Sequence, residues 1–368
     1  MSAESPTGLL PADRARARTI GVVGVLIVFA LLVAGLLWAK WLPYSDKVRT
    51  LADTRAWSGS PIFGSAGAPG AAPSLSGAWE FWKVYFEAVW KAAAVALVVA
   101  AALESLVPRR WLVRLLSRPT TLGQGTVAAL LALPSMMCTC CTAPVAVGLR
   151  RRGAPLGASL AYWLANPLLN PAVVVFLALT LPWQYAVVRV VVGAALVVGG
   201  TALVASRLAR PGATAPAALD PRGAADPTDD PVRWSELPGR FARALRRYLL
   251  VLVPEYAVVV LLTGWLSGWL SDFAGLDDAA GPVALLVVGL VGAALVIPTG
   301  GEVPVVVGLV AAGASLGVAG VLLITLPALS VPSIVMVGRT LSWRATAALA
   351  GLVVVGGLLA GGLLVTLT

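Results

Sequence analysis

The sequence predicts an all-α polytopic membrane protein, an inverted repeat with two re-entrant (broken) helical hairpins and an extra N-terminal transmembrane helix. Three observations predict this fold class: the composition, a duplicated segment and the positions of the arginines. Of the 368 residues, 59% are hydrophobic and 12% are charged. The mean hydropathy of +0.89 is far above that of a soluble globular protein. The first partner that the sequence predicts is therefore the lipid bilayer.

Apolar runs long enough to cross a bilayer, which takes about 20 helical residues, recur along the whole chain. There are seven: Ile20–Ala39, Trp82–Leu106, Ala154–Leu181, Ala186–Ala205, Tyr248–Leu270, Leu316–Val337 and Ala345–Thr366. The first run lacks a convincing small-residue cleavage site, so we interpret it as a retained anchor. Another run, Val283–Val296, is too short to cross alone, which predicts a dip into the bilayer.

One segment occurs twice, at a constant offset of 160 residues. Pro144-Val-Ala-Val-Gly-Leu149 recurs as Pro304-Val-Val-Val-Gly-Leu309, and the turn Gly153-Ala-Pro-Leu-Gly157 recurs as Gly313-Ala-Ser-Leu-Gly317. Both copies are apolar helical stretches that Pro and Gly interrupt at matching places. Paired, interrupted hydrophobic segments of this kind are typical of the binding site of a secondary transporter.

The arginines predict the topology, because basic residues concentrate in cytoplasmic loops. Three arginines between 14 and 18 precede the first run and place the N-terminus inside. The segment Thr120–Leu149 ends in three more arginines, and a crossing there would leave these and the basic residues of 207–247 outside. A re-entrant hairpin keeps them all inside. Their position at the ends of apolar runs also argues against a nucleic-acid partner, despite the net charge of +10.

This topology divides the chain into five segments. They are an N-terminal tail with the first helix (1–40), an external Gly/Pro/Ala-rich loop (41–80), a first permease repeat with a Cys-rich hairpin (81–206), a cytoplasmic linker (207–240) and a second repeat with a Glu-containing hairpin (241–368). Arg189 falls near the outer end of its run and is expected to extend toward the interface. The predicted location is the plasma (inner) membrane, multi-pass, with a cytoplasmic N-terminus.

Prolines bound the two predicted hairpin tips. Pro134 and Pro144 bound the first break, and Pro298 and Pro304 bound the second. Proline lacks the backbone N–H and interrupts the helical ladder. Non-helical backbone at membrane depth survives only where protein buries it or where it lines a polar cavity. We therefore expect the chemistry of the protein at these breaks.

The first break contains all the cysteines of the chain, Cys138, Cys140 and Cys141. Thiolates are soft ligands that prefer ions such as Cu(I), Zn(II), Cd(II) and As(III). A lone buried cysteine is more often a small hydrophobe, but three at one helix break, with none elsewhere, favour a metal site. Their odd number and tight spacing argue against structural disulfides.

Three polar residues are further candidates for substrate binding. Glu302 lies at the second break, where it would neutralise a cation or carry a coupling proton. The alternative is that the tip reaches water and that Glu302 is merely solvated. Asn166 and Asn170 each precede a proline. Their side chains either line a substrate path or hydrogen-bond the backbone groups that the prolines free.

Missing residue types exclude several function classes. The chain has no histidine, which removes imidazole metal sites and any Ser/His or Cys/His catalytic pair. It also has no Gly-x-x-x-x-Gly-Lys-Ser/Thr loop for ATP hydrolysis. We therefore expect a protein that is not an enzyme and needs no cofactor.

The run Leu133-Pro-Ser-Met-Met-Cys-Thr-Cys-Cys-Thr-Ala-Pro144, followed by Gly148-Leu-Arg-Arg-Arg-Gly-Ala154, resembles the signature of a predicted-permease family. That family includes the organoarsenical efflux permeases (ArsP-type) and relatives proposed to export heavy metals. Its pattern is a proline, Cys-Ser-Cys-Gly, a second proline and a Gly-Ala turn after basic residues. An acidic residue before a proline in its second half is matched by Glu302. The resemblance covers roughly residues 82–340.

This resemblance implies that Cys138 and Cys140 are substrate-binding thiols. Thr139 and Cys141 depart from the family's Ser and Gly, and an extra thiol changes which ion fits, so the organoarsenical substrate is not carried over.

The sequence thus predicts secondary efflux of a thiophilic metal or metalloid by alternating access, with protons as the coupling ion. One alternative is a permease for a small uncharged or anionic solute, bound by backbone amides at the hairpin tips while the cysteines are incidental. Another, of a different class, is a membrane thiol redox module.

Overall fold

The computed structural model describes residues 11–57, 72–208, 234–270 and 281–368, and all regular structure in these ranges is helical. The N-terminal part comprises α1 (Pro11–Leu36), the π-helical turn η1 (Leu37–Trp41) and α2 (Leu42–Thr54). The first repeat comprises α3 (Leu75–Leu106), α4 (Arg109–Leu116), α5 (Thr121–Ala132), η3 (Leu133–Ser135), α6 (Thr139–Arg151), α7 (Leu156–Leu168), α8 (Pro171–Thr180), α9 (Trp183–Ala194), η4 (Ala195–Gly200) and α10 (Thr201–Leu208). The second comprises η5 (Trp234–Glu236), α11 (Leu237–Leu270), α13 (Pro282–Ala294), α14 (Glu302–Ala311), α15 (Leu316–Ala328), α16 (Val331–Thr340) and α17 (Trp343–Leu367).

Six of the described helical segments are long and apolar enough to cross a membrane, and α15 with α16 adds a seventh that bends by 48°. They coincide with the predicted apolar runs, so the all-α polytopic fold class is confirmed. The first segment differs in length, because one helical stretch continues from Thr19 to Thr54. The predicted loop 41–80 therefore contains α2 and the start of α3. Most of the predicted linker 207–240 lies outside the described residues.

The duplication reappears in the helix boundaries. α15 and α16 begin and end 160 residues after α7 and α8, and α17 begins 160 residues after α9. In each repeat a two-residue break separates two short helices, at Leu169–Asn170 and at Leu329–Ser330. The apolar pattern and the matching prolines thus generate the same local structure twice.

The unit α5–α6 is a re-entrant hairpin. Its helices have 12 and 13 residues and rise about 20 Å each, less than the roughly 30 Å of the hydrocarbon core. Gln124 near the start of α5 lies beside Gly157 at the start of α7, and Gly153 after α6 lies against Arg109 before α5. Both ends of this hairpin therefore lie at the same end of the bundle.

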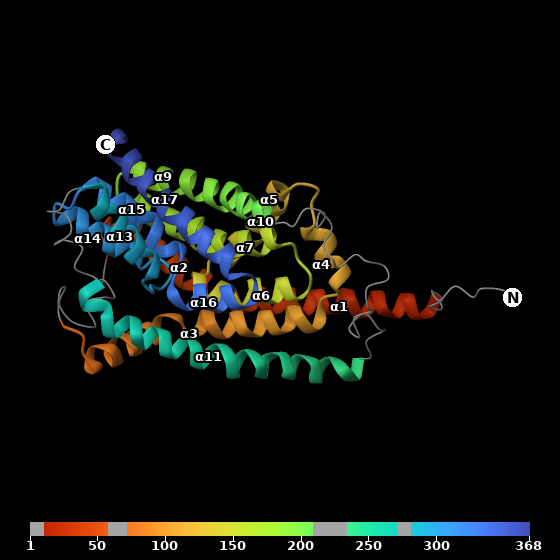
Figure 1. Cartoon of the computed structure of the whole chain (residues 1–368). Helices are drawn as coiled ribbons and strands as arrows, with labels where there is room; N and C mark the ends of the chain where they lie inside the picture. The colour runs from red at the N-terminus through yellow and green to blue at the C-terminus, as the bar shows by residue number, and fades with distance from the viewer. Residues whose placement is uncertain (1–10, 58–71, 209–233, 271–280) are drawn as a thin grey trace.

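The unit α13–α14 occupies the opposite end. Gly317 at the start of α15 lies beside Leu285 of α13. In Figure 1, α13 and α14 lie at the left, whereas α4 and the first turns of α1 lie at the right. The two hairpins enter from opposite ends, as an inverted repeat requires.

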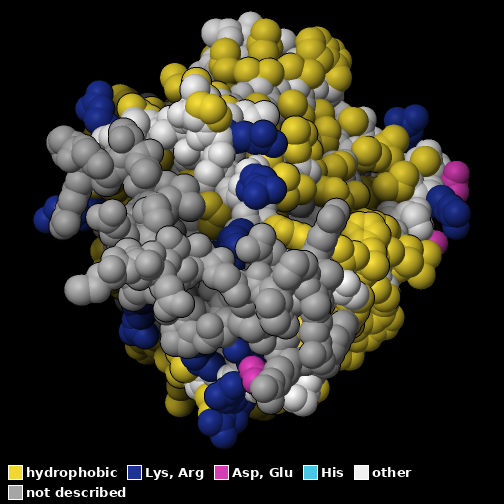
Figure 2. Space-filling model, turned by 90° about the vertical axis from the view of Figure 1, so that its right-hand side faces the viewer, with side chains coloured by type: hydrophobic (Ala, Val, Ile, Leu, Met, Phe, Trp, Pro, Cys, Tyr) yellow, Lys and Arg dark blue, Asp and Glu magenta, His cyan; other side chains and the backbone are white. Residues whose placement is uncertain are grey.

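The long helices α3 and α11 lie side by side and run in opposite directions (Figure 1). Near one end the Tyr248 hydroxyl of α11 donates to Glu104 of α3 at 2.7 Å, and Arg247 forms an ion pair with the same carboxylate. Figure 2 views the right-hand end of the molecule, where Lys and Arg side chains border hydrophobic flanks. Lys and Arg side chains thus gather at this end of an apolar bundle.

Candidate functional site

The first hairpin tip turns between α5 and α6. After η3, Met136 adopts a left-handed backbone with φ of 48°, and α6 begins after Cys138. Asn166 of α7 holds this turn in place, because its Oδ1 accepts hydrogen bonds from the Ser135 hydroxyl and, at 3.3 Å, from the Met137 N–H. Asn166 thus hydrogen-bonds the backbone of the first hairpin tip, and its predicted role in substrate binding stays a prediction.

The four prolines do not act alike. Pro134 and Pro298 lie in the breaks, as predicted. Pro144 and Pro304 do not break the chain, because α6 and α14 run through them. Pro304 is the third residue of α14, where an N–H has no helical partner in any case. Pro144 lies inside α6 and lacks the N–H that would otherwise donate a hydrogen bond to the Cys140 carbonyl.

The three cysteine sulfurs converge. The Sγ of Cys138 lies 3.2 Å from that of Cys140 and 3.0 Å from that of Cys141. All three sulfurs lie within 4.8 Å of one another, and all three residues are buried. Because Cys138 precedes α6 in extended backbone, its sulfur reaches both sulfurs of the first helical turn.

Two tyrosine hydroxyls contact the thiol cluster. The Tyr85 hydroxyl of α3 lies 3.2 Å from the Cys140 sulfur, and the Tyr256 hydroxyl of α11 donates to the same sulfur at 3.6 Å. Thr139 Oγ1 lies 3.2 Å from the Ser330 hydroxyl at the break between α15 and α16. Within the described part of the chain, no carboxylate joins the thiol cluster. Such an all-sulfur site suits a soft ion and not a hard oxygen-seeking cation.

Lys40 is a site residue that the sequence analysis did not identify. It lies in η1 and is only 5% exposed. Its ammonium donates hydrogen bonds to the Tyr44 hydroxyl at 3.0 Å and to Thr299 Oγ1 at 3.2 Å. The next residue, Trp41, donates its ring N–H to the Pro134 carbonyl at 2.8 Å. One turn of the first membrane helix thus contacts the tips of both hairpins.

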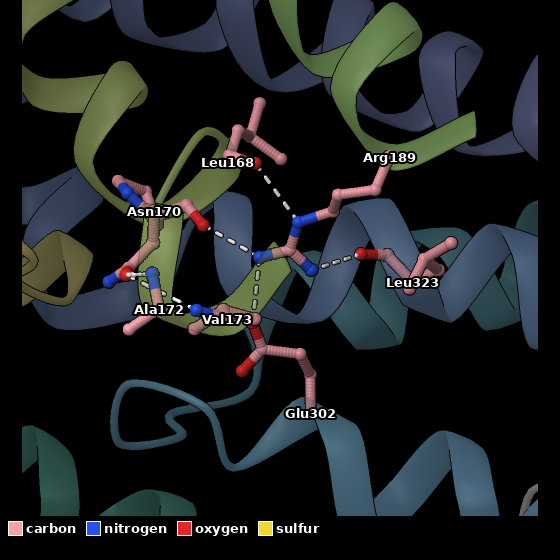
Figure 3. A network of polar contacts seen from close by, with 8 residues as sticks. Leu168, Asn170, Ala172, Val173, Arg189, Glu302 and Leu323 are labelled. Atoms are coloured by element: carbon pink, nitrogen blue, oxygen red, sulfur yellow. Dashed lines mark hydrogen bonds and ion pairs between the residues drawn. The ribbon is translucent and has the colours of Figure 1, made fainter. Parts of the chain in front are cut away.

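Glu302 forms a buried ion pair with Arg189 of α9 (Figure 3). The Nη2 of Arg189 lies 2.7 Å from Glu302 Oε1, and the two side chains are 0% and 2% exposed. The expectation that Arg189 extends to the interface is therefore wrong, because its partners lie in the protein interior. The alternative that Glu302 is solvated fails for the same reason. Glu302 does not belong to the thiol cluster.

Arg189 also donates to carbonyls that lack a helical N–H donor because a proline follows four residues later. It donates to the Pro167 carbonyl at 2.7 Å. It also donates to the Leu323 carbonyl at 2.9 Å (Figure 3). In a regular helix these carbonyls would accept from the N–H groups at positions 171 and 327, both of which are proline. One guanidinium therefore links α7 and α15 to the tip of the second hairpin.

Asn170 caps the half-helix α8. Its Oδ1 accepts from the N–H groups of Ala172 and Val173 at 3.1 and 3.4 Å (Figure 3). The Nδ2 of Asn170 and the Oε2 of Glu302 are buried and have no hydrogen-bond partner among the described residues. As at Asn166, the amide satisfies backbone groups near a proline.

Comparison with known proteins identifies the family of this chain. The sequence profile of the ArsP-type predicted permease family matches residues 74–366. The UPF0718 protein YraQ of Escherichia coli (strain K12) is 36% identical over 345 residues, which cover 92% of this chain and 93% of that protein. No solved structure matches this chain. The profile begins immediately before α3, so α1, η1 and α2 lie outside it. On these matches, the chain belongs to the ArsP-type predicted permease family.

Proposed function

We propose that this permease exports a thiophilic metal or metalloid across the plasma membrane, with Cys138, Cys140 and Cys141 as its ligands. The observation that carries the proposal is the convergence of three buried sulfurs within 4.8 Å at a helix break. Thiolates bind soft ions, and interrupted helices at corresponding places of an inverted repeat form the substrate site of many secondary transporters. The family match supports transport, and the three sulfur ligands indicate a thiophilic ion as the transported substrate.

The contacts between the repeats support alternating access. The first tip contacts the second repeat through Thr139 and Ser330, and the second tip contacts the first repeat through Glu302 and Arg189. Each tip is thus held by the opposite repeat, and a rocking motion would expose the thiols to each side in turn. A cavity of about 280 Å³ lies beside the first tip and is lined in part by Met136 and by residues of α2 and α8. It supports a path by which a substrate approaches the thiols.

The charge distribution supports the proposed orientation. Arg150 donates to the Ala154 carbonyl at 2.9 Å, and Arg151 lies 3.9 Å from Glu104, at the end of the bundle where α1 begins. Concentration of arginines at this end favours the cytoplasmic side. We therefore assign the N-terminus to the cytoplasm and the tip of the second hairpin to an entry from outside.

For coupling, we assign the transported proton to Glu302. One of its oxygens binds Arg189, and the other is buried without a partner among the described residues. Protonation would neutralise the carboxylate and weaken its attraction to the guanidinium. The tip of the second hairpin would then be released from α9, which couples proton binding to the motion of α14.

A second candidate is a permease for a small anionic solute. The buried ammonium of Lys40 favours it, as do the N-terminal ends of α6 and α16, which meet where Thr139 contacts Ser330. Cations and helix N-termini both attract anions. In this case the sulfurs are incidental, and their replacement by serine leaves transport intact.

A resistance and uptake profile tests the proposal. The gene is deleted and restored as wild type, as the triple variant with Cys138, Cys140 and Cys141 replaced by Ser, and as the control Ala143→Ser. The profile covers arsenite, methylarsenite, copper, zinc and cadmium. We expect wild type and the control to lower accumulation of at least one of them, and the triple variant to fail at equal membrane abundance. Full activity of the triple variant would favour the anion permease, whereas loss of only an oxidant response would identify a redox module.

A further inference from the structure

Lys40 is a buried charge without a carboxylate. It lies in a 36-residue helical segment, directly after the apolar run Ile20–Ala39, and is 5% exposed. A buried ammonium is costly unless it is paired with an anion and hydrogen-bonded. Its two hydrogen-bond partners, Tyr44 and Thr299, are neutral hydroxyls, and its Nζ also lies 5.1 Å from the centre of the Tyr44 ring. In the described parts of the chain, no Asp or Glu forms an ion pair with Lys40.

The thiols of the first hairpin tip become anionic when they bind a metal ion, because the thiolate is the ligand. The bond from Trp41 to the Pro134 carbonyl fixes the turn that contains Lys40 on the tip that carries them. The bond to Thr299 fixes it on the other tip. A permanent cation therefore lies between the two hairpins, beside the proposed ligands.

We propose that Lys40 is a built-in counter-cation of the thiol site, and that it selects cargo whose thiolate complex carries one net negative charge. This inference rests on the proposed function and specifies its substrate class. A divalent soft cation bound by three thiolates gives a complex of charge −1, which the ammonium neutralises. Trivalent arsenic bound by the same three thiolates gives a neutral complex and leaves Lys40 uncompensated. The site then favours divalent ions such as Cd²⁺ over arsenite.

Burial turns the difference in net charge between the two complexes into a difference in binding affinity. At the low effective dielectric of a buried site, one unit of uncompensated charge is far more costly than in water. The π-helical turn adds a second indication, since single π-helical turns inside α-helices occur often at functional sites. Lys40 itself lies in η1, before the residues that the family profile matches.

The test measures binding of Cd²⁺ and of arsenite to the purified, reduced full-length protein by titration calorimetry. The variants are Lys40→Met and Lys40→Gln, which remove the charge, and Lys40→Arg, which keeps it. The control is Lys91→Met, whose exposed ammonium lies 5.5 Å from the centre of the Trp38 ring. We expect the neutral variants to lose at least about tenfold in Cd²⁺ affinity, equivalent to roughly 1.4 kcal/mol, with arsenite affinity unchanged or higher. Lys40→Arg and Lys91→Met should keep the wild-type preference.

An unchanged ratio of Cd²⁺ to arsenite affinity in a folded neutral variant overturns the inference. If neither neutral variant folds, Lys40→Arg decides, because a folded Arg variant without the Cd²⁺ preference also overturns it. Failure of the proposed function is a separate result, namely Cd²⁺ binding by the triple serine variant with wild-type affinity.

Discussion

The guanidinium of Arg189 lies 2.7 Å from the carboxylate of Glu302, and this pair joins α9 of the first repeat to the first residue of α14 in the second. The two residues are 113 positions apart in the chain. Their symmetry-related positions, 160 residues away, hold Leu349 and Thr142. The two repeats therefore differ in charge at both of these positions, and the ion pair ties the second hairpin to the opposite half.

Removing one member of the pair should destabilise the protein strongly. We expect Arg189→Leu to lower the free energy of unfolding by about 3–5 kcal/mol, because it leaves Glu302 buried and unpaired. Thermal unfolding in detergent measures this, with the exposed Arg246→Leu as control. Adding Glu302→Thr, which copies the other repeat, should recover part of the loss. A double variant as unstable as the sum of both single variants would contradict this account.

Neutralising Glu302 should separate binding from transport. Glu302→Gln keeps the size of the side chain but fixes it in a neutral state, so proton-driven transport should be lost. Metal binding should remain, because Glu302 is not part of the thiol cluster. Transport is measured in everted vesicles with an imposed pH gradient, and binding on purified protein. Wild-type transport rates with the wild-type pH dependence would remove Glu302 from the coupling mechanism.

The three thiols should not be equivalent. Cys138 Sγ contacts both other sulfurs, at 3.2 and 3.0 Å, and therefore lies at the centre of the cluster. Serine keeps the shape but is a hard ligand. We expect Cys138→Ser to lower Cd²⁺ affinity at least as much as Cys140→Ser or Cys141→Ser, and the ultraviolet charge-transfer band of bound Cd²⁺ reports it. A Cys138→Ser protein with the wild-type band would show that this sulfur is not a ligand.

The orientation is testable in intact cells. In a background without cysteines, we place one cysteine at Ser206, near the end of α10, and another at Leu75, which starts α3 and is 83% exposed. An impermeant thiol reagent added outside should label the cysteine at 75 and not the one at 206. The reverse pattern would invert the assigned topology, and labelling of both would contradict the re-entrant first hairpin.

Much of the fold could be predicted from the sequence, because its signals are local. Apolar runs, prolines and the repeat locate α7, α8, α15 and α16, and the spacing of Cys138, Cys140 and Cys141 predicts their convergence. Long-range pairs gave weaker signals. Lys40 and Thr299 are 259 positions apart, and a charge between Trp38 and Trp41 was the only hint of a buried ammonium. Arg189 was the sole charge in its apolar run, but its position near the end of that run led to the wrong prediction that it extends to the interface.

Cadmium flux into proteoliposomes tests most directly the claim that the thiols at the first hairpin tip carry the cargo. Purified wild type, the triple serine variant and the control Ala143→Ser are each reconstituted into liposomes that enclose a Cd²⁺-sensitive dye. A pH gradient is then imposed across the membrane. We expect saturable Cd²⁺ uptake by wild type and by the control, and only background leakage in the triple variant. Uptake by the triple variant at the wild-type rate would contradict the account.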